Sequence, residues 1–156
     1  MDVKLVNPFI EGTLHILDTT AFVKVKPEAV FLKADNLSQG DISGFLEISG
    51  DLQGTAAISF SKKSILGIVS AMFGEEMTEL NDEIADAVGE ISNMVAGHVT
   101  TKIAEMDKKV KVKFVEIVMG RNQVISHTDA GSHVVSIPFR TTKGKVVVEV
   151  CYADAA

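Results

Sequence analysis

The chain has 156 residues, 46% of them hydrophobic and 23% charged, and its formal net charge at pH 7 is −6. This composition excludes a disordered chain and predicts a single globular domain, residues 1–156, large enough to bury a core without metal or disulfide cross-links. The acidic balance and the lack of a lysine and arginine cluster on any predicted face argue against nucleic acid as a partner, and no apolar run is long enough to cross a membrane. The N-terminus shows no export signal, so we expect a cytoplasmic protein.

The N-terminal part of the chain predicts one helix and then an extended segment. A helix over residues 8–19 is expected, because Asn7 can cap the free amide groups and Pro8 suits the first helical position. Residues 22–33 are rich in valine and phenylalanine, and Pro27 among them is tolerated only at an edge strand or a bulge.

A hairpin and a second helix follow. Residues 42–49 and 55–60 are β-rich runs on either side of a glycine-containing turn, which predicts an antiparallel pair. Ser61 can cap the next helix, which has a broad apolar face, and Gly74 ends it.

The longest predicted helix covers residues 81–106. Its apolar residues recur at intervals of three, four and seven and form one buried stripe: Ile84, Val88, Ile91, Val95, Val99 and Met106. Asn81 or Thr78 can supply the N-cap. Asp82 and Glu83 suit the positive end of the helix dipole.

The last third predicts four strands separated by turns: Val110 to Met119, Gln123 to His127, His133 to Phe139 and Lys145 to Tyr152. Strict alternation places Phe114 on one face of the first of these strands and Ile117 on the other. The order of helix, three strands, two helices and four strands indicates an α+β fold, with helices packed on an antiparallel or mixed β-sheet.

Four residues of the long helix share its exposed side, within roughly 60° of one another and nearly opposite the buried stripe: Asp86, Glu90, Asn93 and Gly97. Polar residues normally occupy the outer face of an amphipathic helix, so periodicity alone favours plain solvent exposure. However, asparagine and glycine are weak helix formers, and a smooth strip from Gly89 to Gly97 would let another protein's backbone come close.

Common catalytic and metal-binding motifs are absent from the sequence, which has no glycine-rich phosphate loop, no paired zinc-ligand spacing and no nucleophile elbow. His98 lies about 80° round the helix from Glu90, so the two are not a natural ligand pair. His127 and His133 flank a turn without an obvious third ligand, and we expect no metal site. Cys151 is the only cysteine and is expected to be a buried thiol in a strand.

The segment Asp86-Ala-Val-Gly-Glu90-Ile-Ser-Asn93 resembles the motif of the CheC, CheX and FliY phosphatases of bacterial chemotaxis, which is Asp or Ser, three residues, Glu, two residues and Asn. The chain is most similar to the single-site, CheX-like members, because the first helix has no Asn at the place that matches a second motif. Element order and length agree with the family along nearly the whole chain. The family has a proline twenty-three positions after the Asn; Glu116 stands there, and we expect it to affect strand geometry more than activity.

The resemblance implies a phosphatase that acts on a phosphorylated response regulator, CheY-P. Glu90 and Asn93 would be the catalytic residues: Asn93 would orient the attacking water in the regulator's active site, and Glu90 would pair with the regulator's active-site lysine. Asp86 and Gly97 would contact the partner. The chain would need no cofactor of its own, because Mg²⁺ is expected in the regulator's active site.

The resemblance to single-site members of this family also implies a homodimer joined through sheet edges, so a homodimer is expected. Two alternatives to the phosphatase stay open. One is a non-catalytic CheX-like adaptor that binds a receiver domain, and the other is a structural module whose polar ridge has no function. Tight receiver binding without an effect on phosphate lifetime would identify the adaptor.

Overall fold

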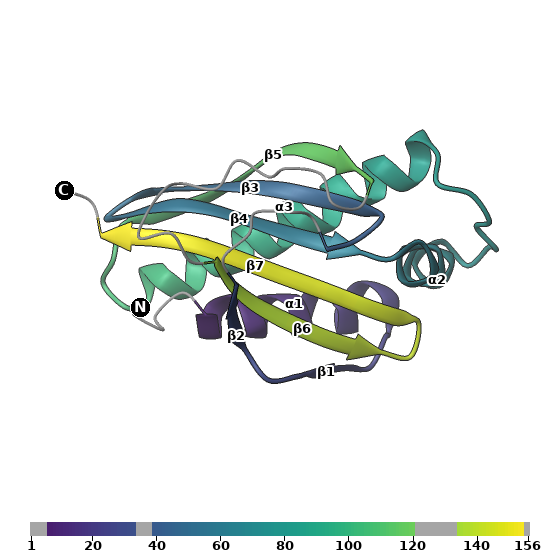
Figure 1. Ribbon diagram of the computed structural model, residues 1–156, viewed down its shortest axis with the longest axis horizontal. Coiled ribbons are helices and arrows are strands. Elements are labelled where there is room, and N and C mark those ends of the chain that lie inside the picture. Colours follow the sequence, from purple (N-terminus) through teal and green to yellow (C-terminus); the bar gives the residue numbers. More distant parts are fainter. Residues whose placement is uncertain (1–5, 34–38, 121–133, 155–156) are drawn as a thin grey trace.

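The computed structural model describes residues 6–33, 39–120 and 134–154, and these residues form an α+β architecture (Figure 1). Three helices pack on an open antiparallel sheet of seven strands in these ranges, which confirms the predicted fold class. The helices are α1 (Val6–Ala21), α2 (Lys62–Phe73) and α3 (Asp82–Ala104). The strands are β1 (Val25–Pro27), β2 (Phe31–Lys33), β3 (Ile42–Gly50), β4 (Leu52–Phe60), β5 (Val110–Met119), β6 (Val134–Thr141) and β7 (Gly144–Asp154). None of these helices is long and apolar enough to cross a bilayer.

The strand order across the sheet is β1-β6-β7-β4-β3-β5, and β2 also pairs with β6. β3 and β4 form the predicted hairpin, with Ile42 opposite Phe60. The predicted extended segment 22–33 is divided into two short strands that pair with opposite ends of β6. Pro27 lies at the end of the edge strand β1, as its missing amide hydrogen requires. The strand predicted over residues 123–127 lies outside the described residues.

The helix boundaries follow local chemistry. Asn81 is the N-cap of α3, since its Oδ1 accepts a hydrogen bond from the backbone N–H of Ile84 at 3.1 Å. Ser61 caps α2 in the same way, and Gly74 ends α2 in the left-handed conformation, with φ of 70°. These predictions are confirmed. α1 is longer than predicted at both ends: it includes Asn7, which was expected to be its cap, and it runs to Ala21, past the two threonines whose hydroxyls donate to helix carbonyls.

The apolar stripe of α3 forms the centre of the core. Its buried members are no more than 1% exposed: Ile84, Val88, Ile91, Val95 and Val99. Met106 was wrongly assigned to this stripe. The helix ends at Ala104, Asp107 has a positive φ of 59°, and Met106 is 43% exposed beyond the last turn.

α3 lies unusually close to the sheet at one point. A Cβ atom built on Gly44 of β3 would lie 2.0 Å from Oγ of Ser92, so only glycine fits opposite this serine. Further along, the backbone N–H of Val112 on β5 donates to Oγ1 of Thr100 on α3 at 3.0 Å. These two contacts fix the height of the helix above β3 and β5.

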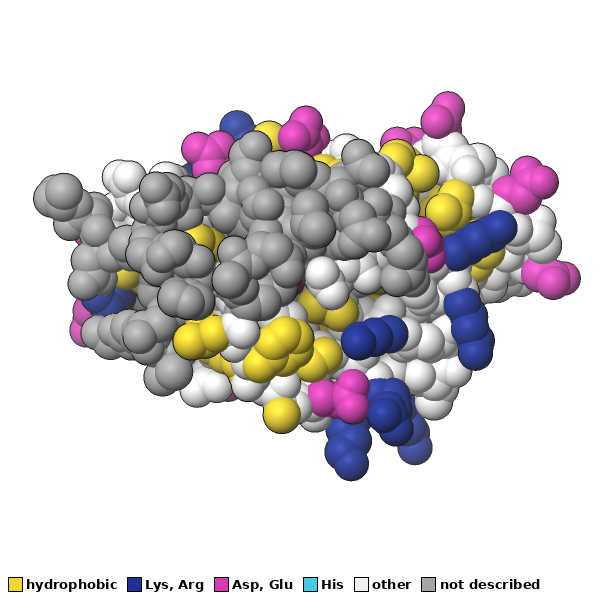
Figure 2. Space-filling view, in the orientation of Figure 1, with side chains coloured by type: hydrophobic (Ala, Val, Ile, Leu, Met, Phe, Trp, Pro, Cys, Tyr) yellow, Lys and Arg dark blue, Asp and Glu magenta, His cyan; other side chains and the backbone are white. Residues whose placement is uncertain are grey.

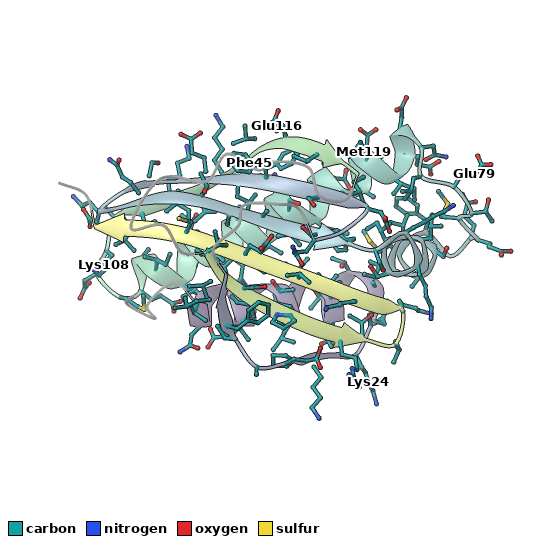
Figure 3. The ribbon with its side chains drawn as sticks, viewed as in Figure 1. Lys24, Phe45, Glu79, Lys108, Glu116 and Met119 are labelled. Atoms are coloured by element: carbon teal, nitrogen blue, oxygen red, sulfur yellow. The ribbon has the colours of Figure 1, made fainter. Side chains whose placement is uncertain are left out.

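A bulge on β5 changes which side chains face α3. Against β3, Phe114 pairs with Leu46 and Glu116 pairs with Phe45, so Val115 is an extra residue without a ladder partner. Figure 3 labels Phe45 and Glu116 on these neighbouring strands. Beyond the bulge Ile117 pairs with Gly44, on the face that α3 covers. The predicted placement of Phe114 and Ile117 on opposite faces is therefore wrong, since the inserted residue shifts the alternation by one.

Strand pairing also assembles a row of cations at the β1 edge. Lys26 lies opposite Arg140, which lies opposite Lys145, and all three side chains are exposed. Lysines and arginines gather at the lower edge of the molecule in Figure 2. The expectation that no face carries such a cluster is wrong here, because pairing joins cations that are far apart in the sequence.

Candidate functional site

The exposed side of α3 forms one wall of a groove. Asp86, Glu90 and Asn93 are all exposed, and all three line the same hollow of about 510 Å³. Their spacing of four and three residues places them on successive turns of one helix face. The three polar side chains that the sequence placed on one ridge therefore open into one common space.

Strand β5 supplies the opposite wall. Phe114 and Ile117 line the groove, together with Ala85 and Gly89 of the helix. A Cβ atom on Gly89 would lie 3.3 Å from Cε2 of Phe114, so the aromatic ring lies directly against the helix backbone. The bulge at Val115 is what brings both apolar side chains to this face.

Sequence reasoning missed this apolar wall. Phe114 carried a signal, as an aromatic residue in a strand next to the motif helix in the chain. Ile117 carried none, because its orientation depends on a bulge that forms only against β3. Glu116, at the position of the family's proline, is a bulge residue with an exposed side chain on the other face of β5.

The chemistry of the groove suits a cation. Two carboxylates and one amide line it, and no lysine, arginine or histidine is among its lining residues. The lining also offers no serine, threonine or cysteine as a nucleophile. No group of three or more His, Cys, Asp or Glu side chains within the described ranges could hold a metal ion. An amide can donate to one group and accept from another, so the groove can bind a positive charge and orient a water molecule.

Gly97 is exposed but does not line the groove. It lies one helical turn beyond Asn93, and a Cβ atom there would meet nothing within 4 Å. The glycine is therefore not required by packing within the described residues. Its assignment as a partner contact stays a prediction.

His15, His98 and Cys151 lie away from the groove. The rings of His98 and His15 are 5.0 Å apart between α3 and α1, and burial, together with the charge on His15, lowers the pKa of His98 below 6.5. Cys151 is buried in β7, as predicted. His127 and His133 lie outside the described residues.

The residues of both walls fall inside a match to a known protein family. The model for the chemotaxis phosphatase CheX matches residues 42–140, which include α3 and β5. The chain belongs to the CheX family. It is 29% identical over 127 residues to the CheY-P phosphatase CheX of Thermotoga maritima, covering 78% of this chain and 79% of that protein.

Solved structures of CheX-family and CheC-like proteins have the same fold. A CheC-like superfamily protein from Shewanella sp. PV-4 superposes with a TM-score of 0.88 at 32% identity, covering 98% of this chain and 99% of that one. CheX from Vibrio vulnificus gives 0.86 at 32% identity, covering 96% and 99%. A chain from the CheX-CheY-BeF3-Mg²⁺ complex of Borrelia burgdorferi gives 0.75 at 18% identity, covering 98% and 100%, a likeness of fold alone.

Proposed function

We propose that this CheX-family chain hydrolyses the aspartyl phosphate of a phosphorylated response regulator of the CheY type. The observation that carries the proposal is the common groove of Asp86, Glu90 and Asn93, a full copy of the family motif on an exposed helix face. The family match and the phosphatase from Thermotoga maritima support the same reaction.

The proposed division of labour follows from what each side chain can do. Asn93 enters the regulator's active site, where its amide donates to one group and accepts from the attacking water. Glu90 pairs with the regulator's lysine and fixes the register of the complex. An acyl phosphate is already activated, so hydrolysis mainly requires a water held in line with the phosphorus–oxygen bond. The metal ion belongs to the regulator.

The partner in this proposal is a receiver domain. A CheX of the same fold from Borrelia burgdorferi was solved in complex with CheY, BeF3 and Mg²⁺, which supports docking between these two classes of protein. A response regulator is a cytoplasmic substrate, and the proposal therefore places this chain in the cytoplasm.

The decisive experiment compares the wild-type chain with Asn93→Ala. We expect the rate constant at saturating chain to fall by roughly a hundredfold or more, because the water loses its positioning group. The measurement is the lifetime of phosphate on each receiver domain of the organism, with and without the chain. Glu90→Gln is the companion variant and should weaken binding of the receiver. Equal phosphate lifetimes with wild type and Asn93→Ala would refute the catalytic role, and tight binding without any hydrolysis would identify an adaptor.

We also propose a homodimer, formed through the sheet edge at β2. Two of its three residues are apolar and exposed, Phe31 at 51% and Leu32 at 59%, and Val30 just before them is 44% exposed. Hydrophobic side chains gather beside β2 in Figure 2. An edge strand with exposed apolar side chains is a template for pairing with a second chain.

A further inference from the structure

The two walls of the groove differ in chemistry, and this difference points to the shape of what enters it. The α3 wall offers the carboxylates of Asp86 and Glu90, whereas the β5 wall offers only the apolar surfaces of Phe114 and Ile117. A ligand that satisfies both walls carries a positive charge at the end of an apolar chain. Among protein side chains, lysine has this form, with an ammonium group on four methylenes.

We propose that Phe114 and Ile117 bind the aliphatic stem of the receiver's lysine while Glu90 binds its ammonium group. This inference rests on the proposed function and adds to it two specificity-determining residues on β5. Lysine side chains bury their methylenes along apolar surface while their charge stays on a polar partner. The ring of Phe114 adds an attraction for the cation itself.

The structure holds this apolar wall in place before any partner arrives. The ring of Phe114 lies against the backbone of α3 at Gly89, where any side chain would be 3.3 Å from the ring. The bulge at Val115 turns Ile117 to the same side, and the lack of a side chain at Gly44 lets the helix lie close to β3, the strand that pairs with β5. A preformed wall loses little side-chain entropy on binding, so its contacts contribute fully to affinity.

The first test is Phe114→Ala, with the phosphorylated receiver that the wild-type chain dephosphorylates fastest. We expect KM to rise about tenfold with kcat unchanged, because the lysine stem is bound equally in the ground state and the transition state. Phe114→Leu retains an apolar surface and should recover most of the affinity. Val115→Ala is the matched control, because Val115 is 45% exposed on the same strand but is the extra residue of the bulge and does not line the groove.

The second test identifies the contact on the partner. Binding is measured with a receiver loaded with BeF3⁻ and Mg²⁺, and with the same receiver carrying its lysine changed to alanine. If the lysine stem packs on Phe114, then Phe114→Ala weakens the first complex about tenfold and leaves the second unchanged. An equal loss of affinity for both receivers would show that Phe114 contacts another part of the partner and would overturn the inference.

The two proposals fail in different ways. A normal kcat and KM for Phe114→Ala, beside an inactive Asn93→Ala, would overturn the lysine pocket and leave the phosphatase intact. A fall in kcat for Phe114→Ala, with unchanged KM, would also overturn it, since the ring would then only position α3. If the wild-type chain shortens the phosphate lifetime of no receiver, the phosphatase proposal is wrong, and if it also binds no BeF3⁻-loaded receiver, the lysine pocket is wrong with it.

Discussion

Asn93 occupies a position where the helix itself would prefer another residue. It lies in the middle of α3 and its side chain is exposed, so no burial offsets its lower helix propensity relative to alanine. The proposed reaction requires an amide at this place. Asn93→Ala should therefore fold at least as well as wild type while losing activity, a combination that a structural role for Asn93 would not produce.

Gly97 offers the cleanest prediction at the residue scale. Gly97→Ala should raise the free energy of unfolding by up to about 1 kcal/mol, because alanine is a better helix former and a Cβ here meets no atom within 4 Å. If the partner's backbone approaches this turn, KM for the phosphorylated receiver should rise at the same time. Chemical denaturation and steady-state kinetics measure the two effects.

The control for this variant is Thr101→Ala, one turn further along the exposed side of α3. It should also stabilise the helix without changing KM. A gain in stability at Gly97 with an unchanged KM would remove Gly97 from the docking surface and confine that surface to the groove.

Among the elements, α3 and the bounds of β5 were predictable, whereas the direction of the β5 side chains beyond its bulge was not, for a physical reason. The cap at Asn81, the buried stripe and the exposed ridge depend on residues within a few positions of one another, so local periodicity determines them. The orientation of Ile117 depends on how β5 pairs with β3, a strand from much earlier in the chain. The α3 wall of the groove could therefore be predicted from the sequence, whereas the β5 wall could be identified only from the strand pairing in the sheet.

The close contact between Ser92 of α3 and Gly44 of β3 should affect activity, although neither residue lines the groove. Gly44→Ala places a methyl group 2.0 Å from Oγ of Ser92 and 2.9 Å from its Cβ, so the helix that carries Asn93 has to move. We expect a loss of roughly 1–3 kcal/mol in unfolding free energy, typical of an overpacked core, together with a lower kcat.

The second-site variant Ser92→Gly tests this explanation. In the Gly44→Ala background it removes the obstructing side chain and should restore part of kcat, even though glycine costs helix stability. Denaturant midpoints and kcat are compared for the two single variants and the double variant. Additive effects on kcat would contradict a steric contact between these residues.

At the scale of the whole molecule, the two edges of the sheet have different characters. β5 carries the groove at one edge, whereas β1 and β2 lie at the other, where exposed apolar side chains of β2 lie at one end of β6 and the row that begins with Lys26 of β1 lies at the other end. If the β1 strands of two chains paired, the Lys26 side chain of each would repel the like charge of the other. The proposed dimer contact is therefore expected at β2.

The oligomeric state tests this expectation. Leu32→Lys should convert a dimer into a monomer, since it places a charge in an exposed apolar patch on an edge strand. Val115→Lys, at a similarly exposed position on the opposite edge, should leave the dimer intact. Light scattering coupled to gel filtration gives the mass of each species. A monomeric wild type, or a monomer only with Val115→Lys, would contradict dimerisation through β2.

The row formed by Lys26, Arg140 and Lys145 places positive charge near one edge of a molecule whose net charge is −6, although Arg140 also forms an ion pair with Glu28 at 3.3 Å. The carboxylates of the groove and this row lie at opposite edges of the sheet. The electrostatic field between them can orient an approaching receiver domain before contact. Added salt screens such a field over about 10 Å. The association rate with a receiver should therefore fall with ionic strength, while the rate of the hydrolytic step within the bound complex should hardly change.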